Sequence, residues 1–78
     1  MKKYKALEID FEIPEALQEY IDDFLENLNE RNGVFADCYE QEIRYLLNEC
    51  REERRLTEEQ IKILWDYYYR GGIYCTEN

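Results

Sequence analysis

The chain has 78 residues, and its 19 acidic side chains against 10 lysines and arginines give a formal net charge of −9 at pH 7. This length predicts a single domain over residues 1–78, and a hydrophobic content of 45% with eight tyrosines argues against intrinsic disorder. The charge disfavours direct nucleic-acid binding, because phosphates would meet carboxylates, and it favours a protein partner with a basic surface.

The residue types that are missing exclude most catalytic sites. The chain has no histidine and no serine, so Ser-His-Asp and Cys-His arrangements cannot form. Its cysteines suit neither a zinc site nor a disulfide, since Cys38 and Cys50 would lie about 18 Å apart along one helix. We therefore expect no enzyme, no metal and no cofactor. An odd cysteine count, with no apolar run long enough for a signal peptide or a membrane span, predicts a cytoplasmic protein.

Residues 7–13 alternate apolar and acidic side chains, which is the period of a half-buried strand. Pro14 ends the strand because it has no N–H to donate, and its fixed φ suits the first turn of a helix. The apolar members of the strand are Leu7, Ile9, Phe11 and Ile13, and the acidic members are Glu8, Asp10 and Glu12.

A first helix is predicted from Pro14 to about Arg31, where Asn32 and Gly33 would supply a left-handed stop. One side of this helix is apolar, and the other carries six carboxylates with no lysine or arginine among them. Like charges four residues apart should destabilise the helix by about 1–2 kcal/mol in total. The apolar side consists of Leu17, Tyr20, Ile21, Phe24, Leu25 and Leu28. The acidic face, as we call the other side, consists of Glu15, Glu19, Asp22, Asp23, Glu26 and Glu30.

Two capping signatures predict two further helices. Asp37 and Glu40 would open the second helix, whose apolar face runs from Tyr39 to Cys50. Thr57 and Gln60 would open the third, from Glu58 to Arg70. Apolar and aromatic residues surround most of the third helix, so it is either the central helix of the domain or a contact with another subunit or partner. Its candidate interface residues are Trp65, Tyr67 and Tyr69.

These elements predict a mainly α fold with a short β element, in the order strand, helix, helix, helix. A single strand cannot satisfy its own backbone groups. It could pair with a short C-terminal strand at residues 73–75, with the same strand of a second copy, or with the sheet edge of a partner.

Pairing with a second copy resembles the ribbon-helix-helix repressors. The resemblance covers residues 7–50 and consists of the element order, Pro14 and Gly33. It implies an intertwined homodimer that acts as a regulator or an antitoxin. The first helix is about one turn longer than in that family. The strand positions with which that family reads DNA are acidic here.

The acidic face extends over about 22 Å of helix axis, a length over which one DNA strand presents about six or seven phosphates. In size and acidity the chain resembles the small nucleic-acid-mimicking inhibitors that phages and mobile elements direct at restriction or CRISPR nucleases. This resemblance implies an inhibitor that occupies a basic nucleic-acid-binding groove through the acidic face, extended by Glu8, Asp10 and Glu12. The alternatives are the ribbon-helix-helix dimer, a structural or adaptor subunit that uses the third helix, and an acidic surface that only keeps the protein in solution.

Overall fold

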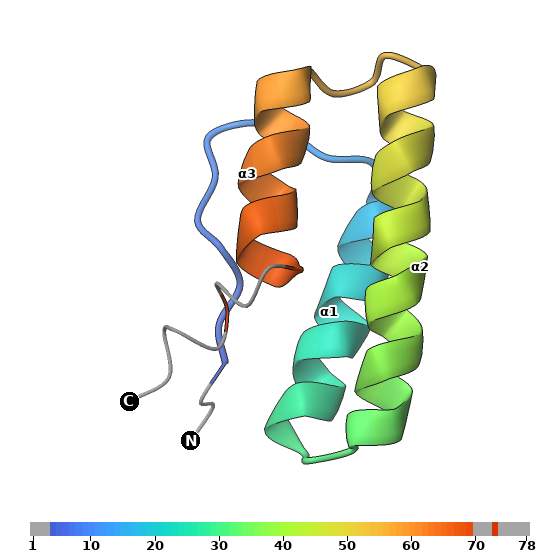
Figure 1. Cartoon of the computed structure of the whole chain (residues 1–78). Helices are drawn as coiled ribbons and strands as arrows, with labels where there is room; N and C mark the ends of the chain where they lie inside the picture. Colours follow the sequence, from blue (N-terminus) through green and yellow to red (C-terminus); the bar gives the residue numbers. More distant parts are fainter. Residues whose placement is uncertain (1–3, 70–72, 74–78) are drawn as a thin grey trace.

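The computed structural model describes residues 4–69 and residue 73, and this part of the chain is mainly helical. Three helices follow one another as α1 (Glu15–Asn29), α2 (Gly33–Glu52) and α3 (Glu58–Tyr68). α1 and α2 form an antiparallel hairpin, and α3 lies beside it (Figure 1). Residues 4–13 run beside α3 before they lead into α1 (Figure 1). The predicted mainly α fold with three helices is confirmed.

No strand is found among residues 4–69 and 73. Residues 7–13, which were expected to form one, are irregular, although the predicted alternation is present in their exposure. The partner strand expected at residues 73–75 falls mostly outside the described residues. The half-buried members of the segment are Leu7, Ile9, Phe11 and Ile13, and the exposed members are Glu8, Asp10 and Glu12.

The segment is held in place by side chains that bond its backbone. The N–H of Leu7 donates to the Tyr68 hydroxyl at 3.0 Å, and the Tyr67 hydroxyl donates to the Lys5 carbonyl at 2.6 Å. These bonds satisfy backbone groups that a neighbouring strand would otherwise pair. They place the start of the chain against α3.

The core lies between the facing sides of the α1–α2 hairpin and the inner side of α3. Leu17, Ile21 and Phe24 of α1 are fully enclosed, as the apolar side of the predicted first helix requires. The rings of Phe24 and of Tyr68 from α3 meet edge to face, with centroids 6.3 Å apart. The complete set of buried residues in the described chain is Leu17, Ile21, Phe24, Leu25, Ala36, Ile43, Leu47, Cys50, Leu56, Ile61, Leu64, Tyr68 and Ile73.

The turn between α1 and α2 differs from the prediction. The left-handed residue is Arg31, with φ of 62°, whereas Gly33 is already the first residue of α2. The N–H of Arg31 bonds the carbonyl of Leu28 at 3.2 Å and that of Asn32 bonds Asn27 at 2.8 Å, which closes α1 two residues before the expected glycine.

The early turn lets α2 begin four residues before the predicted capping box at Asp37 and Glu40. The extra turn buries Ala36, and burial of an apolar side chain favours this early start over the local capping preference. It also leaves Val34 and Phe35 largely exposed, at 77% and 61%.

The predicted capping box of α3 is confirmed. The Thr57 hydroxyl accepts from the N–H of Gln60 at 3.1 Å, and the Gln60 side chain accepts from the N–H of Thr57 at 3.0 Å. α3 is not enclosed on all sides, however. Its residues Ile61, Leu64 and Tyr68 are buried, Lys62 and Ile63 are exposed, and Trp65, Tyr67 and Tyr69 are half-buried.

Candidate functional site: the acidic face of α1 and the groove beside it

The core packing of α1 determines the direction in which its carboxylates point. Because Leu17, Ile21 and Phe24 are enclosed, the opposite side of the helix is turned outward. Five of the six residues of the acidic face are exposed and one, Asp23, is half-buried. The structure therefore keeps the six residues together, five on α1 and Glu30 at its C-cap.

No lysine or arginine among the described residues forms an ion pair with the acidic face. The ion pairs formed between described residues lie on α2, α3 and the turn between them: Arg51 with Glu58, Arg55 with Glu53, and Lys62 with Asp66.

Among the described residues, neutral side-chain amides donate hydrogen bonds to two carboxylates of the acidic face. The Gln18 side chain donates to Asp22 at 2.9 Å, and the Asn32 side chain donates to Glu30 at 3.4 Å. Amides orient the carboxylates but add no positive charge. The acidic face consequently retains its negative charge.

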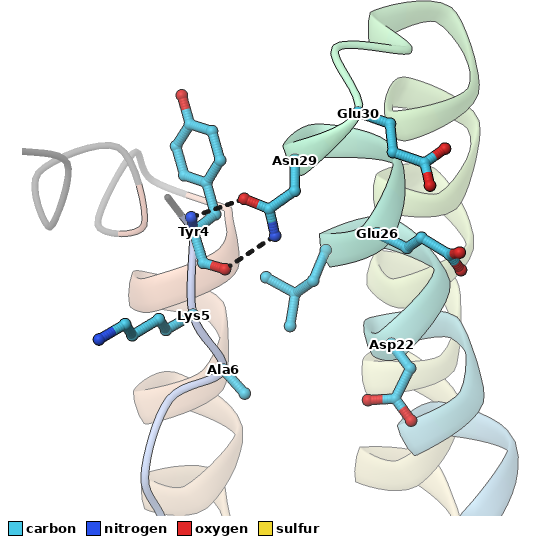
Figure 2. Close-up of a pocket in the computed structure, with 8 residues that line it drawn as sticks. Tyr4, Lys5, Ala6, Asp22, Glu26, Asn29 and Glu30 are labelled. Carbon is cyan, nitrogen blue, oxygen red and sulfur yellow. Dashed lines mark hydrogen bonds between the residues drawn. The ribbon is translucent and has the colours of Figure 1, made fainter. Parts of the chain in front are cut away.

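A groove of about 820 Å³ lies between residues 4–6 and the C-terminal half of α1. Asp22, Glu26 and Glu30 also line this groove, and Figure 2 shows them in a row along α1, with the carboxylates of Glu26 and Glu30 directed away from residues 4–6. The side chain of Lys5 points away from that row (Figure 2). The apolar part of the lining comes from Tyr4, Ala6 and Leu25.

The Asn29 side chain ties the far wall of the groove, residues 4–6, to α1. Asn29 accepts from the N–H of Tyr4 at 2.8 Å and donates to the Tyr4 carbonyl at 3.0 Å, the two dashed bonds in Figure 2. An amide that uses its oxygen and its nitrogen in this way pairs with the backbone as a neighbouring strand would. The groove is thus formed in the unbound protein.

The acidic residues of the N-terminal segment do not line this groove. Glu8 and Asp10 border a separate depression of about 370 Å³ with Ile63 of α3, and Glu12 lines neither. The predicted site residues therefore divide into the acidic face on α1 and a smaller exposed acidic group beside α3.

The candidate interface residues of α3 contact other parts of the same chain. Trp65 and Tyr69 meet edge to face with centroids 4.8 Å apart, and Arg44 donates to the Tyr69 hydroxyl at 2.9 Å. Glu40 and Arg44 have the four-residue spacing of a helical ion pair, but these two described residues form none with each other. Burial and the nearby Asp37 instead raise the pKa of the Glu40 carboxyl. A groove of about 570 Å³ exposes part of Trp65 between α2 and α3.

Two buried groups of the core have raised pKa values. Burial raises the pKa of the Tyr68 hydroxyl, the hydrogen bond from the N–H of Leu7 opposes this rise, and Tyr67 and Asp22 add smaller contributions to it. Burial likewise raises the pKa of the Cys50 thiol, so this group stays protonated near neutral pH. Cys38 is a free, exposed thiol.

Sequence reasoning identified the carboxylates but missed the groove. Tyr4, Ala6 and Asn29 carry no motif, and their proximity depends on contacts between residues 25 positions apart. The only local signal was the basic start of the chain, which includes Lys5.

Comparison of the chain with protein-family models, with curated proteins and with solved structures finds no match. Within residues 4–69 and 73, no helix has the length and apolar character needed to cross a bilayer. In the same residues no group of three or more cysteines, aspartates and glutamates is arranged to hold a metal ion.

Proposed function

We propose that this protein is a non-enzymatic binding protein, active in the cytoplasm, that engages a basic surface of another protein through the acidic face of α1. The observation that carries the proposal is the outward row of carboxylates on one rigid helix, none of them paired with a described lysine or arginine. A positive surface is the electrostatic complement of such a row.

The rest of the described surface supports this assignment by contrast. α2 and α3 mix acidic with basic side chains and form ion pairs, as surfaces that only maintain solubility commonly do. On α1 the like charges stand four residues apart, an arrangement that destabilises a helix. A contact with a basic partner would relieve that repulsion, whereas solubility alone does not require the charges to share one face.

The more specific form of the proposal is a mimic of nucleic acid. The charge spacing along α1 approximates that of one DNA strand, so the helix could occupy a cationic groove that normally holds a strand. An inhibitor of a nuclease or of another nucleic-acid-binding protein would use this geometry. Direct binding of the protein to nucleic acid is disfavoured by the same charges.

The proposal is tested by neutralising part of the acidic face. Glu19→Gln, Asp23→Asn, Glu26→Gln and Glu30→Gln are combined in one variant. Affinity capture from a lysate at about 0.1 M salt should recover basic proteins with the native chain and lose them with the variant. Capture by the native chain should also fail near 1 M salt, where the Debye length is about 3 Å. The variant should melt at the same or a higher temperature, because like-charge repulsion is reduced.

A matched control removes the same number of charges from exposed positions elsewhere. It combines Asp37→Asn, Glu42→Gln, Glu52→Gln and Glu59→Gln on α2 and α3. Retained capture by the control, with loss in the acidic-face variant, supports the proposal. Equal capture by the native chain and both variants contradicts it.

The partly exposed Trp65 supports a second candidate function, an adaptor that binds through the groove between α2 and α3. In that case Trp65→Ala should abolish capture and the Trp65 fluorescence of the native chain should change on binding, while charge removal on the acidic face has little effect. A ribbon-helix-helix homodimer would instead melt at a temperature that rises with protein concentration.

A further inference from the structure

We infer that the groove between residues 4–6 and α1 binds an extended basic peptide segment, with arginine or lysine side chains aligned along Asp22, Glu26 and Glu30. The inference rests on the proposed function and deepens it, because it names the half of the acidic face that is used and the form of the partner. A linear segment, such as a tail or loop of the partner, is the occupant.

The lining of the groove suits long cationic side chains. Leu25, Ala6 and Tyr4 supply an apolar floor on which the methylene stems of arginine or lysine can pack. The carboxylates of Asp22, Glu26 and Glu30, the rim acids that line the α1 side of the groove, then accept charge-assisted hydrogen bonds from cationic ends that reach across α1. The groove therefore offers an apolar contact for the stem of an arginine or lysine and a carboxylate for its cationic end.

The spacing of the rim acids matches an extended chain. Carboxylates four residues apart on a helix repeat every 6 Å or so, and side chains on one face of an extended peptide repeat about every 6.7 Å. Over three positions the two rows therefore differ by only about 1–2 Å, which flexible side chains absorb. Cations at every second position of the segment should bind best.

A helical partner fits the groove less well. Helices dock through apolar anchors repeated over two turns, and here only Leu25 and two residues of the N-terminal segment provide apolar contact. A second copy of this chain would bring further negative charge to the rim. The negative charge of the groove and its small apolar floor therefore favour an extended basic segment over a helix or a second copy of the chain.

The groove requires little rearrangement before it binds. Asn29 holds the backbone of Tyr4 through two hydrogen bonds, and Lys5 is directed away from the rim acids (Figure 2). A site formed in advance avoids the entropy of ordering a loop on binding.

The test uses the full chain and two synthetic peptides of identical composition. One peptide carries three arginines at every second position, and the other carries them consecutively. Dissociation constants are measured by fluorescence anisotropy at about 0.1 M salt. The native protein should bind the alternating peptide several-fold more tightly than the consecutive one.

Two charge variants locate the contact on α1. The rim variant combines Asp22→Asn, Glu26→Gln and Glu30→Gln. The matched control combines Glu15→Gln, Glu19→Gln and Asp23→Asn, so that it loses the same charge from the same helix outside the groove. The rim variant should weaken binding of the alternating peptide about tenfold or more, and the control should weaken it by about threefold or less.

A third variant fills the groove without changing charge. Ala6→Phe at this exposed position should weaken peptide binding by an amount similar to that of the rim variant, with a melting temperature close to that of the native chain. If the two charge variants weaken binding equally and Ala6→Phe has no effect, the peptide does not bind in the groove. That result would leave the proposed function unaffected. If the native chain binds neither peptide, the groove is not a binding site for a basic segment. The proposed function itself fails only by its own capture experiment.

Discussion

At the scale of single residues, the described N-terminal segment is held by polar side chains that bond its backbone. Asn29, Tyr67 and Tyr68 each bond a backbone group of residues 4–7. Such bonds contribute about 1 kcal/mol each when both partners are satisfied, and losing one partner of a buried pair costs more. These polar side chains therefore fix the position of residues 4–6, which form one wall of the candidate groove.

The contribution of Tyr68 to stability can be tested through its dependence on pH. Burial raises the pKa of its hydroxyl above the ordinary value near 10. Above pH 10 the unfolded chain releases this proton while the folded chain still holds it. The contribution of Tyr68 to stability is therefore complete below pH 10 and is lost as the pH rises through the folded-state pKa.

Tyr68→Phe should consequently reduce the free energy of unfolding at pH 7 by about 1 kcal/mol, because the N–H of Leu7 loses its acceptor. The variant should also lose less stability than the native chain between about pH 9 and 11. Urea denaturation at each pH measures both effects. Tyr20→Phe, at a half-buried position, serves as the control. A decline with pH identical to that of the native chain would show that Tyr68 does not cause it.

At the scale of helices, α1 and α2 end in the same way. A left-handed arginine follows each helix, Arg31 with φ of 62° and Arg54 with φ of 57°. After α2, the N–H of Arg54 bonds the carbonyl of Arg51 at 3.2 Å, and that of Arg55 bonds Cys50 at 2.9 Å. This pattern normally contains glycine, because a side chain in the left-handed region is strained by about 1–2 kcal/mol. The positive charge near the helix C-terminus offsets part of that strain.

The strain at Arg54 is measured by comparing two substitutions. Arg54→Gly and Arg54→Ala remove the same charge, and only glycine relieves the backbone. The glycine variant should therefore be more stable than the alanine variant by about 1 kcal/mol in thermal or urea unfolding. At the adjacent Arg55, which has no positive φ, the order should reverse or vanish. An alanine variant as stable as the glycine variant at Arg54 would show that the turn is not strained.

At the scale of the whole molecule, the net charge of −9 acts against a compact fold. The radius of gyration of 12.0 Å concentrates this charge within a few Debye lengths at low salt. Three exposed ion pairs between described residues counter this repulsion. Repulsion should therefore exceed attraction between surface charges.

Added salt should then stabilise the fold and weaken partner binding. The melting temperature is expected to rise by several degrees between about 0.02 M and 0.5 M NaCl as repulsion is screened. The variant with four neutralised residues on the acidic face should show a smaller rise. A melting temperature that falls with salt would mean that attractive ion pairs dominate. The opposite responses of stability and binding distinguish a charged recognition surface from an apolar one.

Local patterns in the sequence predicted much of the architecture. The 3.6-residue periodicity located α1 and its buried side, and the pair of Thr57 and Gln60 marked the start of α3. The same periodicity placed six carboxylates on one side of α1. These features depend on residues within a few positions of one another, so the order of side chains alone determines them.

Features that depend on distant contacts were decided only by the tertiary structure. The predicted stop at Gly33 was wrong because α1 closes at Arg31 and Ala36 is buried in the core. The groove exists because Asn29 bonds Tyr4 across 25 positions of the chain. No local pattern encodes such a pairing, since its free energy comes from the burial and hydrogen bonding that arise when separate elements pack together. The chain order determined which residues are acidic and aligned, and the packing determined that three of them border a groove.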